Sequence, residues 1–125
     1  MKVEKDNSFF TGRLKSIGYA VKGCYKLITT EHSIMVQFTL SIILIIAGFY
    51  FNISREEWMI QILAFGLVLA VESLNTAIEK VADFIHPEFS NRIGLIKDIA
   101  AGGVFFAAIA AISVGLLIYV PKFLN

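Results

Sequence analysis

The chain has 125 residues, of which 57% are hydrophobic and 17% charged, and its formal net charge is +1. Its mean hydropathy is +0.73, whereas soluble domains are only about 45–50% apolar. This composition indicates an integral membrane protein, and the small net charge argues against a nucleic-acid partner. A single cysteine, Cys24, excludes an intrachain disulfide.

The first predicted element, residues 8–30, is an amphipathic helix. Lys15, Lys22 and Lys26 fall on the face opposite an apolar stripe whose members recur at steps of three and four. The stripe consists of Phe10, Leu14, Ile17, Val21, Cys24 and Ile28. An apolar stripe with a lysine face is typical of a helix that lies in the membrane interface. A cytosolic helix packed on a partner is the alternative.

Three apolar segments follow, at residues 34–53, 58–77 and 99–120. Each has about twenty residues, which at ~1.5 Å per residue suffice to cross a ~30 Å hydrocarbon core. The first and third carry no charge, and the second carries one, Glu72. We therefore predict an all-α membrane protein with three transmembrane helices. The residues predicted to mark the membrane boundaries are Trp58, Tyr119, Pro121 and Lys122.

Basic residues predict the orientation of these spans. Six Lys or Arg residues, including Lys2 and Lys5, precede the first span, and three more lie between the second and third. The opposite side carries only Arg55 and Lys122. Because cytoplasmic loops are enriched in Lys and Arg, we expect a cytoplasmic amino terminus.

The third span repeats small residues at every fourth position, which lets helix backbones approach closely in lipid. These residues are Gly103, Ala107, Ala111 and Gly115. A subunit with three spans does not easily enclose a polar site, so helices from neighbouring copies are expected to complete it. A homo-oligomer is predicted.

The second span ends in a polar stripe formed by Glu72, Asn75, Glu79 and Asp83. On a helix these positions fall within an arc of about 80° and rise by ~16 Å. Ionisable residues inside a span are costly and usually serve a function. The structural alternative for Glu79 and Asp83 is a solvated helix end. For Glu72 and Asn75 it is a satisfied hydrogen-bonded pair.

Other polar residues are predicted at the same membrane face. Glu31 and Glu79 offer two carboxylates for a hard divalent cation, and Lys97 offers a positive charge for a phosphate. Glu72 lies deeper, where it could accept the proton of a lipid hydroxyl. Such a set suits phosphoryl transfer, although intramembrane carboxylates also serve proton relays and transporters. The sequence has no GxxxxGK[ST] phosphate loop and no HExxH zinc motif.

Three stretches together resemble the prokaryotic integral-membrane diacylglycerol kinase family, which includes undecaprenol kinases. They are ESLNTAIEKVAD at 72–83, KDIAAGGV at 97–104, and GYAVKG at 18–23 with Glu31 nearby. The likeness covers nearly the whole chain. It departs at Met35, where many relatives carry an Arg.

The resemblance implies an ATP-dependent, homotrimeric lipid kinase of the bacterial inner membrane, with active sites shared between subunits. By matching position, Glu72 is the general base, Asn75 helps to order the site, and Glu31 and Glu79 are ligands of the Mg²⁺ that accompanies ATP. The residues implied as nucleotide contacts are Tyr19, Lys97, Asp98, Glu88 and, more weakly, Arg13. The acceptor is a membrane lipid alcohol, either diacylglycerol or undecaprenol, and the stretch from Asp98 is somewhat closer to the undecaprenol type.

Two other functions compete with a lipid kinase. A small oligomeric transporter or proton channel using Glu72 needs polar residues that continue across the membrane, but residues 59–71 are apolar except for Gln61. A membrane adaptor without chemistry leaves Glu72, Asn75 and Lys97 unexplained. The lipid kinase is therefore the favoured interpretation.

Overall fold

The computed structural model describes residues 9–125, which form four α-helices. They are α1 (Phe9–Thr30), α2 (His32–Phe51), α3 (Arg55–Ile85) and α4 (Asn91–Leu124). The last three are long and apolar enough to cross a membrane. The predicted all-α class with three candidate spans is thereby confirmed. Residue 8 of the predicted first helix, and Lys2 and Lys5 of the orientation count, lie outside the described residues.

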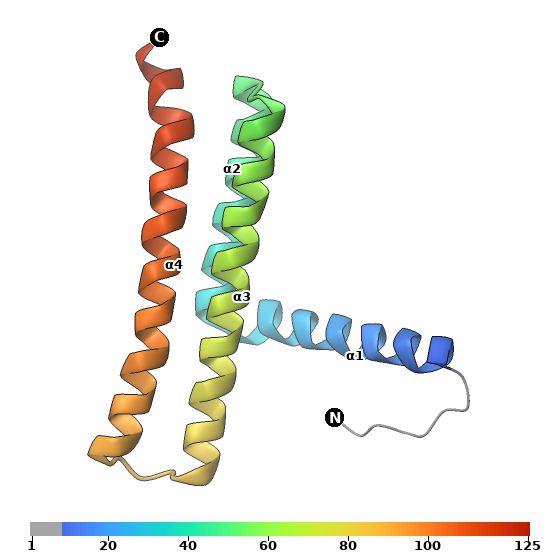
Figure 1. Cartoon of the computed structure of the whole chain (residues 1–125), viewed down its shortest axis with the longest axis vertical. Helices are drawn as coiled ribbons and strands as arrows, with labels where there is room; N and C mark the ends of the chain where they lie inside the picture. Colours follow the sequence, from blue (N-terminus) through green and yellow to red (C-terminus); the bar gives the residue numbers. More distant parts are fainter. Residues whose placement is uncertain (1–8) are drawn as a thin grey trace.

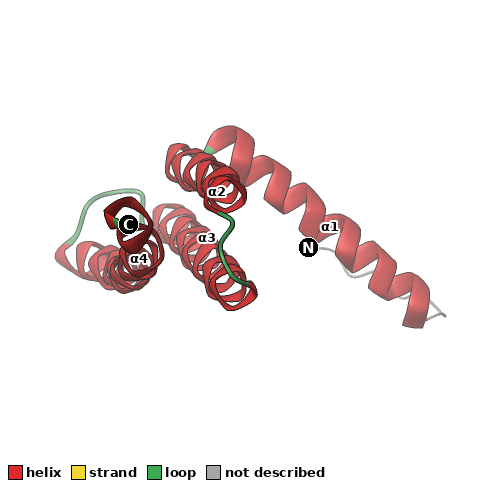
Figure 2. Ribbon diagram, turned by 90° about the horizontal axis from the view of Figure 1, so that it is seen from above, coloured by secondary structure: helices red, strands yellow, loops and turns green. Residues whose placement is uncertain are grey.

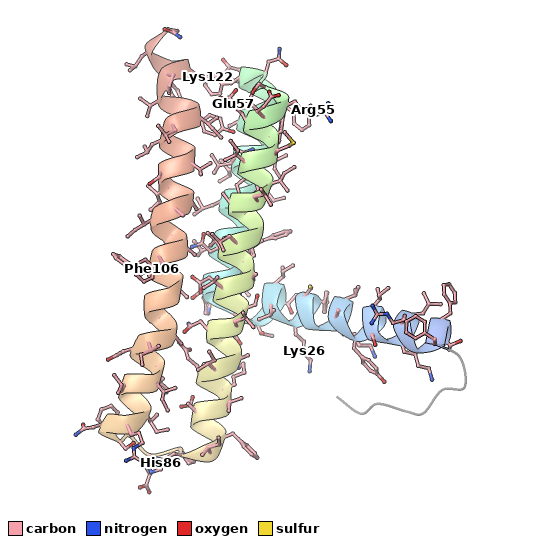
Figure 3. The ribbon with its side chains drawn as sticks, viewed as in Figure 1. Lys26, Arg55, Glu57, His86, Phe106 and Lys122 are labelled. Carbon is pink, nitrogen blue, oxygen red and sulfur yellow. The ribbon has the colours of Figure 1, made fainter. Side chains whose placement is uncertain are left out.

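The three long helices run side by side, and α1 projects sideways from the start of α2 (Figure 1). Seen along the bundle, α3 lies between α4 and α1 (Figure 2). We call the end of the bundle where α3 begins the Arg55 end, and the opposite end, where α3 and α4 are joined, the His86 end (Figure 3). No residue of α1 is buried. The position of α1 in a membrane interface stays a prediction.

At the Arg55 end, α2 and α3 are joined by a short turn with defined caps. Asn52 ends α2 in the left-handed conformation, at φ 53°. Ser54 begins α3 with a capping box, because its Oγ accepts from the backbone N–H of Glu57 and the Glu57 carboxylate accepts from the N–H of Ser54. Glu57 also pairs with Lys122 of α4 at 3.2 Å (Figure 3). These contacts fix all three long helices at this end.

Both α3 and α4 continue beyond the apolar segments 58–77 and 99–120. α3 runs on to Ile85 because nothing in the polar sequence opposes a helix until His86, which precedes Pro87 and is disfavoured in the helical conformation. α4 begins at Asn91, after Ser90 accepts a hydrogen bond from the N–H of Ile93 at 3.2 Å. The two helices thus form a hairpin that extends past the level of α1 (Figure 1).

Two residues predicted to mark the end of the third span, Tyr119 and Pro121, lie within α4. Tyr119 is buried, and its hydroxyl donates to Gln61 Oε1 at 2.6 Å. Pro121 lies inside α4, which continues to Leu124. A proline so close to the end of a helix removes only one backbone hydrogen bond of the last turns, so the helix tolerates it.

Candidate active site

The polar stripe of α3 changes from buried to exposed along the helix. Glu72 is buried, with 8% of its surface accessible, and Thr76 lies beside it with the same value. Asn75 is half-buried, whereas Glu79 and Asp83 are exposed. The Asn75 amide Nδ2 donates to Glu79 Oε1 at 3.0 Å, which places these two side chains on one face as predicted. The stripe therefore joins a buried carboxylate to an accessible one.

Glu31 reaches this stripe from the junction between α1 and α2. Its backbone is extended and it occupies the N-cap position of α2. Its Oε1 lies 3.1 Å from the Nζ of Lys80, the residue that follows Glu79 on α3. Glu31 is therefore next to α3 at the level of Glu79. Lys80 was not among the predicted site residues, and the only sequence signal for it is its position beside Glu79.

Lys97 approaches the stripe from α4. Its Nζ donates to Asp83 Oδ1 at 2.7 Å, and both side chains are substantially exposed. The next residue, Asp98, is exposed on α4. The α3–α4 hairpin thus brings a cation from one helix to the carboxylates of the other, although 14 residues separate Lys97 from Asp83 in the chain.

Arg13 and Tyr19, implied as nucleotide contacts, lie on α1, on the side of α3 away from α4 (Figure 2). Arg13 stacks over the ring of Phe9, 5.6 Å from its centroid, and Tyr19 is 42% exposed. Glu88 lies in the turn at the His86 end, where its carbonyl accepts a hydrogen bond from His86 Nδ1. No hydrogen bond or ion pair joins these three residues to Lys97 within residues 9–125.

No three Asp, Glu, His or Cys side chains within residues 9–125 lie close enough to hold a metal ion. Glu31 and Glu79 are two oxygen donors at one level of α3, which suits Mg²⁺, because this ion is usually held by one or two carboxylates together with substrate phosphates and water. The carboxylate chemistry therefore fits Mg²⁺ bound with a nucleotide. It does not fit a metal site whose ligands are all side chains of residues 9–125.

One polar atom of the stripe has no partner. The Asn75 side-chain Oδ1 is buried and accepts no hydrogen bond, while its Nδ2 is engaged by Glu79. Leaving a buried acceptor unpaired costs about 1–3 kcal/mol. The atom lies between Glu72 and Glu79 along the stripe, so a bound hydroxyl or water there would satisfy it. Asn75 Oδ1 is therefore available to accept a hydrogen bond.

The chain matches known proteins over most of its length. Residues 18–119 match the family model described as prokaryotic diacylglycerol kinase. The chain is 35% identical over 116 residues to an undecaprenol kinase of Bacillus subtilis, covering 93% of this chain and 91% of the relative. It is 28% identical over 103 residues to a diacylglycerol kinase of Escherichia coli K12, covering 82% and 84%.

A third relative, a diacylglycerol kinase of Haemophilus influenzae, is 31% identical over 97 residues, covering 78% of this chain and 82% of the relative. The family match includes Tyr19, Glu31 and the whole α3 stripe, and it ends at Tyr119. Matches of this extent, to proteins named for closely related activities, leave one assignment. This chain belongs to the prokaryotic diacylglycerol kinase family and is a lipid kinase.

Proposed function

We propose that this chain transfers the γ-phosphoryl group of ATP to the hydroxyl of a membrane lipid alcohol at the α3 stripe. The observation that carries the proposal is the burial gradient from Glu72, which is 8% accessible, to the exposed Glu79. A lipid hydroxyl comes from the hydrocarbon and a nucleotide from water. A stripe that joins the two environments allows both reactants to meet.

In this proposal Glu72 accepts the proton of the lipid hydroxyl as that oxygen attacks phosphorus. Asn75 donates to Glu79 and leaves its own Oδ1 free to accept a hydrogen bond from a bound hydroxyl or water. Glu31 and Glu79 would hold Mg²⁺, which neutralises phosphate charge when it is bound with ATP. Lys97, now paired with Asp83, would turn toward the phosphates as a point charge.

The remaining nucleotide contacts are proposed to come from Tyr19, Asp98, Glu88 and Arg13. Because α1 lies across α3 from α4, the helix that carries Lys97, a neighbouring copy is the natural source of further nucleotide contacts (Figure 2). Large apolar side chains of the three long helices are exposed along their length, and exposed apolar surface of this extent marks contact with lipid or protein. We therefore propose a homotrimer in the bacterial inner membrane, with α1 at the cytoplasmic interface.

A proton channel through Glu72 is not favoured. Gln61, the polar residue within the apolar run of α3, is 2% exposed and its side chain bonds to Tyr119 and to the Leu44 carbonyl. Between Gln61 and Glu72 the buried face of α3 carries Val68. The polar groups thus form two separate clusters with apolar packing between them.

The test is phosphoryl transfer by the purified protein in mixed micelles, using labelled ATP and Mg²⁺ with either undecaprenol or dioleoylglycerol. We expect labelled lipid phosphate that requires both Mg²⁺ and a lipid alcohol. Failure to label any lipid alcohol, in preparations that are folded by circular dichroism, would refute the proposal.

A further inference from the structure

Lys80 adjoins the proposed metal site but has no role in the proposed function. It follows Glu79 directly on α3, and its Nζ lies 3.1 Å from Oε1 of Glu31. Glu31 and Glu79 are the two carboxylates proposed to hold Mg²⁺. The ammonium group of Lys80 is therefore a cation of the chain itself, paired with one of the two proposed metal ligands.

The backbone of Glu31 is fixed on both sides, so its carboxylate starts from a defined place. The N–H of Glu31 donates to the Leu27 carbonyl of α1 at 3.1 Å, and its carbonyl accepts from the N–H of Met35 of α2 at 3.0 Å. Although Glu31 is the N-cap residue of α2, its side chain makes no capping hydrogen bond. The carboxylate is instead paired with Lys80 of α3. A metal ion that binds Glu31 must therefore share this carboxylate with Lys80 or displace the ammonium group.

Lys80 can leave this carboxylate at little cost. Its side chain is 70% exposed, against 28% for Glu31, and exposed ion pairs of this kind are weak. A lysine carries its charge on a flexible four-carbon stem, so the ammonium group can turn without any movement of α3. Because Lys80 is the neighbour of Glu79 in the chain, its charge stays near the site after it has left Glu31.

The free metal ion and its nucleotide complex have charges of opposite sign. Mg²⁺ is a cation, whereas Mg²⁺ with ATP is an anion, because the charge of the triphosphate outweighs that of the metal. A lysine at the site repels the free ion and competes with it for Glu31, but it attracts the complex. A unit charge a few ångströms away in water changes the binding of another ion by about three- to tenfold. Lys80 is thus strong enough to set a preference between the two.

We propose that Lys80 makes this site selective for the metal–nucleotide complex over the free metal ion. It neutralises Glu31 until Mg²⁺ arrives with ATP, and its ammonium group then turns to the phosphates as a point charge. The inference rests on the proposed function, because it needs Glu31 and Glu79 as the metal ligands. Its consequence is a pair of effects with opposite signs. Loss of the Lys80 charge strengthens binding of the free ion and weakens binding of the complex, whereas loss of a merely structural contact would weaken both.

Lys80→Gln tests this inference, because it removes the charge and keeps a polar side chain. Lys80→Arg keeps the charge and the ability to pair with a carboxylate. The matched control is Lys122→Gln, which breaks a similar ion pair at the Arg55 end, where Lys122 Nζ lies 3.2 Å from Glu57 Oε1 (Figure 3). Glu57 and Lys80 are separated by about 35 Å along α3, at ~1.5 Å per residue. Each protein is purified in detergent micelles, and its fold is checked by circular dichroism.

Two binding measurements give the answer, and neither needs phosphoryl transfer. Electron paramagnetic resonance follows Mn²⁺, a spectroscopic substitute for Mg²⁺, as it binds without nucleotide. Fluorescence follows the Mg²⁺ complex of a non-hydrolysable, fluorescent ATP analogue. For Lys80→Gln we expect the Kd of Mn²⁺ to fall about three- to tenfold and the Kd of the complex to rise by a similar factor. Lys80→Arg and Lys122→Gln should keep both values within about twofold of the natural protein.

Mn²⁺ binding that is unchanged or weaker in Lys80→Gln would overturn the inference, as would unchanged or tighter binding of the nucleotide complex. Equal effects in Lys122→Gln would also overturn it, because they would show a general effect of lost charge. If Lys80→Gln is unfolded, Lys80→Met, which keeps the apolar stem, is measured in its place. A natural protein that binds both probes but labels no lipid alcohol would instead refute the proposed function.

Discussion

Replacing Glu72 with Gln separates the chemical step from substrate binding. The substitution keeps the size of the side chain and removes its ability to take a proton. Because Glu72 is buried at 8% accessibility beside Thr76, a side chain of equal volume leaves no cavity. An amide also escapes the cost of burying a charge, so the stability of the protein should not fall. The fold and the nucleotide contacts should therefore survive.

The expected loss in kcat is about 10²- to 10⁴-fold, which is the usual contribution of a general base. The KM for ATP should change little, since Glu72 lies about two to three helical turns from the exposed residues Glu79 and Asp83, where the nucleotide would bind. Initial rates of lipid phosphorylation give kcat, and a fluorescent ATP analogue gives nucleotide affinity. The conservative control is Glu72→Asp, which keeps a carboxylate and should retain part of the activity. Turnover within a few-fold of the natural protein in Glu72→Gln would refute the role of this residue as the base.

Three further predictions concern residues around the stripe and at the Arg55 end. Glu31→Gln should raise the Mg²⁺ concentration needed for half-maximal activity, and an unchanged Mg²⁺ titration would exclude a role in metal binding. Lys97→Gln should raise the KM for ATP. Because its ion pair with Asp83 is exposed, the substitution should change the unfolding free energy by less than about 1 kcal/mol. A larger fall in the unfolding free energy would show that Lys97 has a structural role. Gly48→Ala should destabilise the protein by about 1–3 kcal/mol, because a Cβ there would lie 2.7 Å from the Trp58 ring. The control is Gly66→Ala, where a Cβ meets nothing within 4 Å; equal melting temperatures for the two would contradict the packing argument.

The three candidate spans could be predicted from the sequence because twenty uncharged residues have few other stable environments. The ends of the helices could not be predicted in the same way. Hydropathy reports where the hydrocarbon ends, whereas a helix begins and ends where its backbone is capped, at His86 for the end of α3 and at Ser90 for the start of α4. The packing of Tyr119 could not be predicted either, since an aromatic residue near the end of an apolar run indicates only a position near the membrane interface. Its buried hydrogen bond to Gln61 depends on how α3 and α4 pack against each other.

The stripe on α3 was visible in the sequence because residues three and four apart share a face of any helix. The contacts that connect it to other helices were less visible. Lys97 was expected near phosphate, but its contact with Asp83 depends on the register of the hairpin. Lys80 contributed to the predicted orientation but not to the predicted site, because a lysine beside a carboxylate on a helix usually points into solvent. Its pairing with Glu31 arises because α1 and α2 meet beside α3 at this level.

Both lysines near the stripe now neutralise carboxylates that the proposed mechanism uses or adjoins. Lys80 pairs with Glu31 and Lys97 with Asp83, at 3.1 Å and 2.7 Å. Exposed ion pairs of this kind contribute only about 0–1 kcal/mol, so exchanging them for contacts with Mg²⁺ and phosphate costs little. The lysines keep the carboxylates from repelling one another before the nucleotide binds. Glu72 has no such cation among its described contacts, which is consistent with a carboxylate kept available for a proton.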